Sequence, residues 1–464
     1  MAIKPILSSF VSFIMRFLIL CTSILLSATA YAQPELESWL LNTDGATGQY
    51  WNGNNLVQMQ DECDVQLVQY SADNVYVHAS GVPRYATAPF PDGNPAIAAA
   101  QDYLFQIPRN PQEGPTGGTP TGLGHTGVLI NGVVIFNAQD AFSYNNQGVW
   151  HQNGGFFEND GFDCAKGHPA MGQYHHHQVP TRFDDSLDPT SDVCNGFPSD
   201  ALFTLDVESH SPLIGFAFDG YPIYGPYGFA NDDGSGGIVR IETSWQLRDI
   251  AVRHTLADGT ELPPNQYGPD VGEMVTPPIP PGAEPVQAVL GAYIEDHEYV
   301  EGSGHLDAFN GRYAVTPEYP SGTYAYYATV DANHNGQYPY FFPAYRGVVE
   351  TDNFGGGPGP GGGGGTNVTI DEEVETWTGD ATRVGQVVAL TAPFFSYPNP
   401  TSGVVRFAGK VPEKMEVYDG MGRYVITWNR SEIIGGVSLS GWPAGAYHCQ
   451  DPTTGLRSLL ILQP

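Results

Sequence analysis

Basic residues are scarce in this chain. It carries 18 Lys and Arg against 50 Asp and Glu, which gives a formal net charge of -32. Proteins that bind nucleic acid or anionic lipid need clusters of Lys and Arg, because these side chains neutralise phosphate groups. The composition therefore argues against a nucleic-acid partner and is typical of a well-solvated surface.

Long hydrophobic segments are also scarce. The one marked apolar run, residues 17–26, follows Lys4 and Arg16 and precedes Ala30-Tyr31-Ala32. This order predicts a signal peptide over residues 1–32 and a mature chain that starts at Gln33. No later segment approaches the ~20 apolar residues of a membrane span. We expect a secreted protein, or one attached to the outer cell surface.

Cysteines are few. Apart from the one in the signal segment, the chain holds Cys63, Cys164, Cys194 and Cys449. Export permits disulfides. Cys449 lies beyond a linker, and we favour a Cys164–Cys194 disulfide because these two residues are close in sequence and flank a histidine cluster. The alternative is four buried free thiols.

Long helical periodicity is scarce as well, whereas 57 Gly and 38 Pro predict many turns and long loops. Short runs rich in β-branched and aromatic residues predict strands at 65–70, 75–79 and 324–330, and a hairpin over 128–136 around Asn131-Gly132. The best helix candidate is residues 95–105. The sequence predicts a mainly β fold.

A Gly/Pro-rich linker, residues 354–366, divides the chain. It separates a large β-rich region, 33–353, from a C-terminal region, 367–464. The charge changes with the boundary: residues 393–464 hold six basic and five acidic side chains, a net charge of +1. The acidity therefore belongs to the large region.

The most informative stretch is a histidine cluster. Four of the 13 His fall within ten residues, at positions 168, 175, 176 and 177. Imidazole is mostly neutral at pH 7 and suits transition metals. If residues 174–178 form a strand, His175 and His177 face one way and His176 faces the other. We expect His176 at the surface or outside the inner ligand shell.

Several blocks around this cluster, in the same order, resemble the YHYH domain of bacterial exported proteins. The resemblance covers residues 126–348 and implies no defined activity. The blocks are Phe162-Asp163-Cys164, Gly167-His168-Pro169, Tyr174-His175-His176-His177, His210-Ser211-Pro212, Phe218-Asp219-Gly220-Tyr221, Asn310-Gly311-Arg312 and Thr316-Pro317-Glu318.

Metal sites usually need a third or fourth ligand. We therefore predict His175 and His177 as co-ligands with His168, the nearest candidate, or His210, which opens the next block. Asp219 is a candidate either for a ligand or for orienting a ligand imidazole, and Asp163 is a second candidate for the orienting role. No Cys-x-x-Cys or His-Glu-x-x-His pattern is present, so neither a structural zinc ribbon nor a zincin is supported. We expect the ion to be a transition metal, copper or zinc.

A weaker cation site is calcium at Asp331, Asn333 and Asn335. The twelfth position of such a loop is Phe342, so the bidentate Glu of an EF-hand is missing. A plain hairpin turn explains these residues better.

The C-terminal region resembles the sorting domain of type IX secretion in Bacteroidetes, with its core at about 394–464. The resemblance implies a small β-sandwich and the type IX machinery as a partner. The motifs are Tyr397-Pro398-Asn399-Pro400-Thr401-Ser402-Gly403, Met415-Glu416-Val417-Tyr418-Asp419-Gly420-Met421-Gly422-Arg423 and Gly445-Ala446-Tyr447.

Three functions remain open at this stage. The first is an exported domain that binds a transition metal through histidines, and it ranks first because no general base or nucleophile stands out. The second is a metal-dependent hydrolytic or oxidative enzyme. The third is an adhesive or interaction module in which the histidines are structural.

Overall fold

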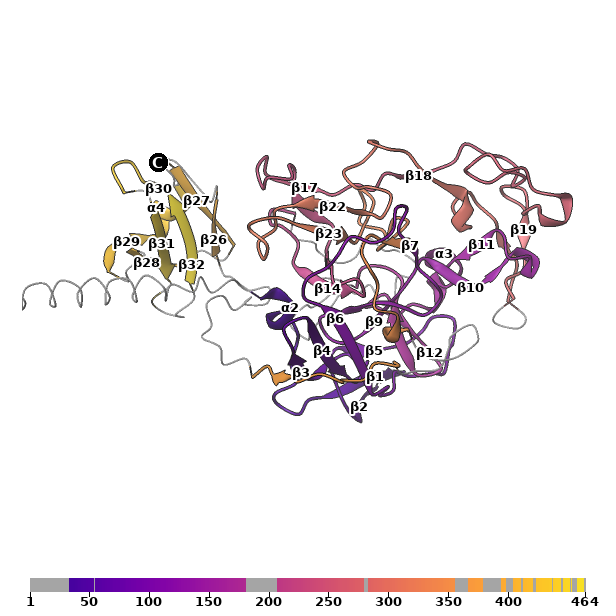
Figure 1. The fold of residues 1–464 in the computed structure, drawn as a ribbon, viewed down its shortest axis with the longest axis horizontal. Helices are drawn as coiled ribbons and strands as arrows, with labels where there is room; N and C mark the ends of the chain where they lie inside the picture. Colours follow the sequence, from indigo (N-terminus) through magenta and orange to yellow (C-terminus); the bar gives the residue numbers. More distant parts are fainter. Residues whose placement is uncertain are drawn as a thin grey trace, which may run out of the picture. The chain divides into compact units, whose positions relative to one another are not determined.

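The computed structural model describes residues 33–53, 55–180, 207–278, 283–354 and 366–378, with shorter segments between 394 and 462. The chain forms two compact units, Met1–Thr382 and Arg383–Pro464 (Figure 1). Both are built mainly from strands, which confirms the predicted fold class. The predicted signal peptide, residues 1–32, lies outside the described residues.

An eight-stranded sheet is the centre of the large unit. Its neighbours are antiparallel except for the pairs β13–β9 and β15–β23. In order across the sheet the strands are β12 (Gly167–Ala170), β13 (Gln173–His176), β9 (Val134–Phe136), β8 (His125–Leu129), β14 (Leu213–Ala217), β15 (Pro222–Tyr224), β23 (Thr323–Tyr327) and β22 (Gly311–Ala314).

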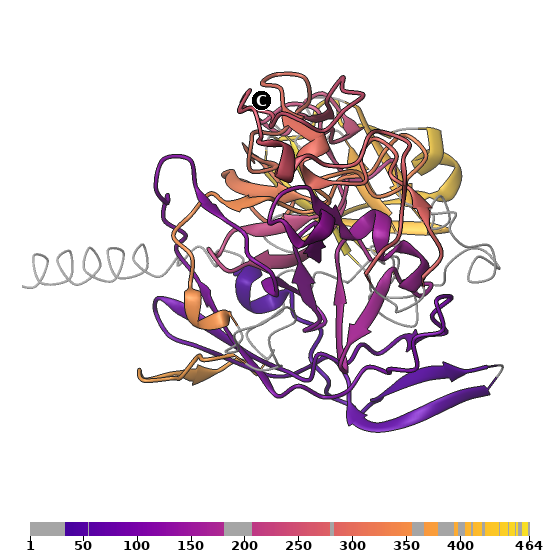
Figure 2. The same ribbon diagram turned by 90° about the vertical axis from the view of Figure 1, so that its right-hand side faces the viewer.

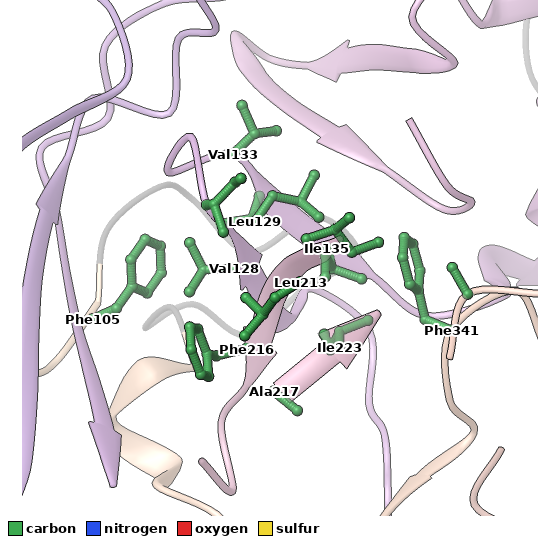
Figure 3. Packing of buried hydrophobic residues seen from close by; sticks show 14 of the residues in the cluster. Phe105, Val128, Leu129, Val133, Ile135, Leu213, Phe216, Ala217, Ile223 and Phe341 are labelled. Atoms are coloured by element: carbon green, nitrogen blue, oxygen red, sulfur yellow. The ribbon is translucent and has the colours of Figure 1, made fainter. Parts of the chain in front are cut away.

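The central strands of this sheet are buried on both faces. Every residue of β8, β9 and β14 is buried, which explains the nearly continuous apolar sequences of β9 and β14. Figure 3 shows their side chains meeting Phe105 of β6, from a second sheet. Strands β8 and β9 form the predicted hairpin, and Gly132 supplies its left-handed residue, with φ of 78°.

The second sheet contains the predicted strand at residues 65–70. Its outer strand, β25, comes from beyond the Gly/Pro-rich segment and appears in Figure 1 as the short orange arrow beside β3. In order the strands are β25 (Glu375–Thr376), β3 (Val65–Tyr70), β4 (Asn74–Ala79) and β6 (Tyr103–Pro108).

The helix expected over residues 95–105 is wrong. Residues 95–102 form no regular element, and β6 begins at Tyr103. Alternate residues of β6 are buried, and the strand pairs with β4 from Ala79↔Tyr103 onward. The ladder of hydrogen bonds with β4 and this two-residue burial pattern outweigh a weak local helix preference.

A third, three-stranded sheet carries a hairpin that projects from the large unit (Figure 2). Two-stranded pairs and short helical turns make up the remaining regular elements among the described residues of this unit. The third sheet contains β2 (Asn55–Glu62), β1 (Thr47–Asn52) and β5 (Ala86–Thr87). The pairs are β10 (Gln139–Ser143) with β11 (His151–Asn153), β16 (Tyr227–Phe229) with β17 (Ile238–Arg240), β18 (Trp245–Leu247) with β21 (His297–Tyr299), β19 (Met274–Val275) with β20 (Val286–Gln287), and β24 (Ala344–Tyr345) with β7 (Thr119–Pro120). The helical turns are α2 (Pro34–Glu37), α3 (Gly154–Phe157), η1 (Tyr144–Asn146), η2 (Asn159–Gly161), η4 (Pro264–Gln266), η5 (Ile294–Asp296) and η6 (Thr351–Asn353).

The C-terminal unit has two sheets and a hydrophobic core of its own. Buried residues from both sheets, among them Val405, Val417 and Leu460, form this core, so the unit is the small β-sandwich that the sequence predicts. Its elements are β26 (Phe394–Tyr397), β27 (Val404–Gly409) and β30 (Val437–Ser438) in one sheet, β29 (Tyr424–Asn429), β28 (Lys414–Asp419), β31 (Gly445–Gln450) and β32 (Arg457–Leu462) in the other, and helix α4 (Arg430–Gly435).

Among the described residues, no helix has the length and apolar character needed to cross a membrane.

Candidate metal centre

The hairpin of β12 and β13 positions three of the four clustered histidines. The two strands are antiparallel, and His168 pairs directly with His175. The turn between them uses Met171 and Gly172, both with positive φ. Directly paired side chains on one face of a hairpin lie about 5 Å apart, so the turn brings His168 beside His175 although they are seven residues apart in sequence.

The side chains after Tyr174 alternate as a strand requires. His175 and His177 point into one cluster, and their Nε2 atoms lie 3.2 Å apart. His176 points the other way. Its Nε2 lies 2.9 Å from the Tyr85 hydroxyl, and its Nδ1 lies 2.9 Å from the carbonyl oxygen of Lys166. His176 is fully buried, which corrects the alternative that it lies at the surface.

The fourth member of the cluster is Glu158, which the sequence did not single out. It follows helix α3, whose N-terminus is capped by the Asn153 side chain, and it precedes the η2 turn. Gly154, at the start of α3, lies against the ring of His177: a Cβ there would be 3.2 Å from Nδ1. The small residue lets the helix approach the hairpin and direct Glu158 toward the imidazoles.

Four potential ligand atoms converge in this cluster. A Glu158 oxygen, Oε2, lies 2.9 Å from His177 Nε2 and 3.2 Å from His168 Nε2. One ligand atom from each of Glu158, His168, His175 and His177 lies within 4.8 Å of every other. These distances alone would make ion pairs, yet Oε2 and His168 Nε2 form no hydrogen bond of acceptable geometry.

Backbone carbonyl groups fix the protonation of two rings. His175 Nδ1 lies 3.0 Å from the Gln173 carbonyl oxygen, and His177 Nδ1 lies 2.7 Å from that of Asn137. A carbonyl oxygen only accepts, so both Nδ1 atoms donate and each neutral ring presents its Nε2 lone pair to the cluster. Two lone pairs and a carboxylate oxygen facing one another require a cation or a proton between them.

The spacing fits a metal ion. In a tetrahedral site with bonds of about 2.0–2.1 Å, ligand atoms are separated by about 3.3 Å. The three close distances, 3.2 Å, 2.9 Å and 3.2 Å, lie within a few tenths of an ångström of that value. The carbonyl contacts to Nδ1 are also the usual outer contacts of metal-binding imidazoles.

The pKa values of the two central imidazoles, His175 and His177, are shifted in opposite directions. Burial and the neighbouring His168 and His177 hold the pKa of His175 well below its usual value. Burial alone would also lower the pKa of His177, but the Glu158 carboxylate outweighs it and the pKa is raised. Without a metal, the Glu158 carboxylate therefore favours protonation of His177.

The two aspartates proposed to orient ligands lie elsewhere. The Tyr174 hydroxyl lies 2.9 Å from each Asp163 oxygen and donates to this carboxylate, and Oδ1 also accepts the backbone N–H groups of Ala165 and Gly167. Asp219 accepts the Tyr326 hydroxyl at 2.5 Å and the Gly347 N–H at 2.9 Å. Burial raises the pKa of each aspartate to about 6. Asp163 therefore acts on the base of the hairpin rather than on an imidazole.

His210 is not brought into this cluster. Its ring packs against Tyr224 and Phe229, with centroids 5.0 and 5.1 Å apart, and its Nδ1 lies 2.7 Å from the carbonyl oxygen of Ser211. Of the two candidates for a further histidine ligand, the structure places His168 with His175 and His177.

The turn considered for calcium uses its oxygens internally. Asp331 Oδ1 accepts the N–H groups of Asn333 and Asn335, and Oδ2 accepts the side-chain amide of Asn335 at 3.0 Å. Val330 and Gly336 bridge the ends of this turn. These contacts are those of a hairpin turn.

Cysteine chemistry is partly described. Cys164 is disulfide-bonded, whereas Cys63 and Cys449 are buried free thiols. Cys194 lies outside the described residues, so its pairing with Cys164 stays a prediction.

The family model described as YHYH protein matches residues 104–338, which is 235 of the 464 residues and includes the whole cluster. No curated protein and no solved structure matches the chain.

Proposed function

We propose that this chain, which belongs to the YHYH protein family, binds one divalent transition-metal ion through Glu158, His168, His175 and His177. The observation that carries this proposal is the convergence of three imidazoles and one carboxylate in a group that can hold an ion. Imidazole and carboxylate ligands without thiolate suit zinc and copper in their divalent states. We therefore propose zinc or copper as the ion.

Elemental analysis of the full chain tests this proposal. After exposure to excess Zn²⁺ or Cu²⁺ and removal of free metal, we expect one ion per chain. The double variant His175→Ala/His177→Ala should retain none. His210→Ala is the matched control, because it removes a partly buried imidazole outside the cluster and should keep the ion.

Two results would contradict the proposal. Metal-free wild-type protein under all loading conditions would leave the histidines with a structural role. Loss of the ion from His210→Ala, with the fold intact by circular dichroism, would mean that the ligand set is wrong.

We further propose that the protein is exported and that the C-terminal unit directs type IX secretion. The signal-like residues 1–32, the sorting motifs and the separate core of the C-terminal unit support this proposal. Deleting residues 383–464 in a host with that machinery should leave the large unit inside the outer membrane. Equal release of the truncated and full chains would contradict it.

A further inference from the structure

Glu158 reaches the candidate metal centre from the end of a very short helix. Helix α3 has four residues, about one turn, and the Glu158 N–H donates to the Gly154 carbonyl oxygen at 3.0 Å. Figure 1 shows this helix beside β10 and β11. Because a single turn separates them, the position of Asn153, the N-cap residue of α3, is linked directly to that of Glu158.

The Asn153 side chain holds the start of this helix with both of its polar atoms. Its Oδ1 accepts the Gly155 N–H and the Tyr340 hydroxyl, each at 3.0 Å, and its Nδ2 donates to the Gly291 carbonyl oxygen at 3.0 Å. Tyr340 and Gly291 lie 187 and 138 residues further along the chain. Asn153 is buried, so segments that are distant in sequence meet at one buried amide.

A fully buried ion pair anchors the Gly291 side of this contact. Gly291 donates its N–H to Asp296 Oδ2 at 2.9 Å, and Arg253 donates to both oxygens of Asp296, each at 2.7 Å. The guanidinium also donates to the Val289 carbonyl oxygen at 2.8 Å. Since the backbone is held on both sides of Gly291, the carbonyl group that Asn153 binds has little freedom to move.

The start of α3 and the ring of His177 are attached to consecutive residues. Gly154 donates its N–H to the Ala138 carbonyl oxygen at 2.8 Å, and His177 Nδ1 donates to the carbonyl oxygen of Asn137 at 2.7 Å. The 2.9 Å separation of Glu158 Oε2 and His177 Nε2 therefore depends on how α3 is oriented about this shared attachment.

On these contacts, and resting on the proposed metal binding, we infer that Asn153 is a positioning residue of the metal centre. It does not touch the ion but sets the direction in which α3 presents Glu158 to the imidazoles. Without the Asn153 amide, the helix loses its N-cap acceptor and its ties to Tyr340 and Gly291. Glu158 then adopts several orientations, of which only some bind the ion, so metal affinity decreases and the ligand geometry of the bound ion changes.

Cobalt(II) reports both effects, because its visible absorption measures the bound fraction and changes with ligand geometry. We would titrate the full-length wild type and Asn153→Ala with Co²⁺. The variant should bind Co²⁺ roughly tenfold more weakly, the size of effect typical of groups that orient metal ligands, and its spectrum at saturation should differ from that of the wild type. A purely structural role would lower stability without changing the spectrum of the bound ion.

Asn153→Asp is the conservative variant, and it also serves if the alanine variant folds poorly. It keeps the acceptor oxygen of an equally good N-cap residue but loses the amide that donates to Gly291. Its affinity for Co²⁺ should therefore lie between those of the wild type and Asn153→Ala.

Asn42→Ala is the matched control. Asn42 also accepts a backbone N–H with its Oδ1, from Ala46, and donates from Nδ2 to a distant carbonyl group, that of Cys63, but it lies in a turn before β1 and outside the cluster. This control should keep the affinity and the spectrum of the wild type. Wild-type affinity and spectrum in Asn153→Ala would overturn the inference, and so would equal weakening in Asn42→Ala. Failure of the wild-type chain to bind Co²⁺ would instead contradict the proposed metal binding itself.

Discussion

His176 is adjacent in sequence to the clustered histidines, but its side chain does not belong to the cluster. It stands between two histidines of the candidate metal centre, yet its ring lies between the Tyr85 hydroxyl and the Lys166 carbonyl group. We expect His176→Gln to keep the metal ion, because the side chain faces away from the cluster. The variant should lose roughly 1–3 kcal/mol of folding free energy, since buried polar partners are left imperfectly paired.

Urea unfolding and metal analysis of the same preparation check this prediction. His177→Ala is the comparison, because it removes a ring of the cluster itself and should lose the ion. If both variants lose the ion to the same degree, the alternation of side chains between the two faces of the strand does not determine which histidines bind the ion.

Proton competition at His177 sets the pH dependence of metal binding. The Glu158 carboxylate raises the pKa of His177 above its usual value of 6.5. At any pH below this raised pKa, a proton competes with the metal for the imidazole. Metal affinity should therefore fall as the pH decreases through that value, by about tenfold per pH unit. His175 does not add to this fall, since its pKa is lowered.

Competition titrations between pH 8 and pH 5 measure this effect. In Glu158→Ala the carboxylate that raises the pKa is missing, so the fall should begin at a lower pH than in the wild type. The same pH dependence in both proteins would contradict the assignment.

At the scale of elements, the segment after the Gly/Pro-rich linker belongs to the large unit. Residues 366–378 add β25 to the edge of β3, and Glu372 accepts the hydroxyl of Tyr76 at 2.6 Å. Trp377 donates its backbone N–H to Val68 and packs its ring against Tyr70 and the main core. The predicted boundary at residue 367 lies within this segment, whereas the C-terminal unit begins at Arg383.

Trp377→Ala should therefore destabilise the large unit by roughly 1–3 kcal/mol, because it removes a partly buried aromatic ring. Glu373→Ala is the control from the same segment, since Glu373 is exposed and should change stability little. The two variants are compared by thermal unfolding of the full chain, with the unfolding of each unit followed separately. Equal effects would mean that the segment does not stabilise the sheet.

The sequence predicted those elements whose signals are local. The strand at residues 65–70 and the hairpin around Asn131-Gly132 follow from β-branched residues and a turn dipeptide, and both are present. The strand β25 was missed because Glu375 and Thr376 gain their pairing only from the distant edge of β3. The helix expected at residues 95–105 failed for the same reason, because pairing with β4 decides β6.

The candidate metal centre was predicted in part. The close sequence spacing of His168, His175 and His177 reflects one hairpin, so a strand argument brings them together. Glu158 carried no signal, because nothing in its local sequence distinguishes it from the other acidic residues of a chain with 50 of them. Its position depends on the packing of α3 against the hairpin, which residue spacing does not encode.

At the scale of the whole molecule, the acidic charge should govern how fast the ion arrives. The chain without its first 32 residues carries a net charge of -34, because those residues hold two basic side chains and no acidic ones. A negative surface concentrates cations and accelerates their association. Raising NaCl from low to high concentration should therefore slow Zn²⁺ uptake, by roughly tenfold.

Stopped-flow measurements with a zinc indicator test this effect. The dissociation rate is the internal control and should change little, because the bonds to the ion are short-ranged. An uptake rate that is independent of salt would mean that the overall charge plays no part in delivering the ion.

The central claim is that one ion lies between Glu158, His168, His175 and His177. Anomalous diffraction from crystals of the zinc-loaded protein tests it most directly. We predict a single strong zinc peak within the cluster, about 2.0–2.2 Å from each Nε2 atom and from an oxygen of Glu158. Crystals of loaded protein with no anomalous peak between these four side chains, or with the peak at His210 instead, would contradict the account.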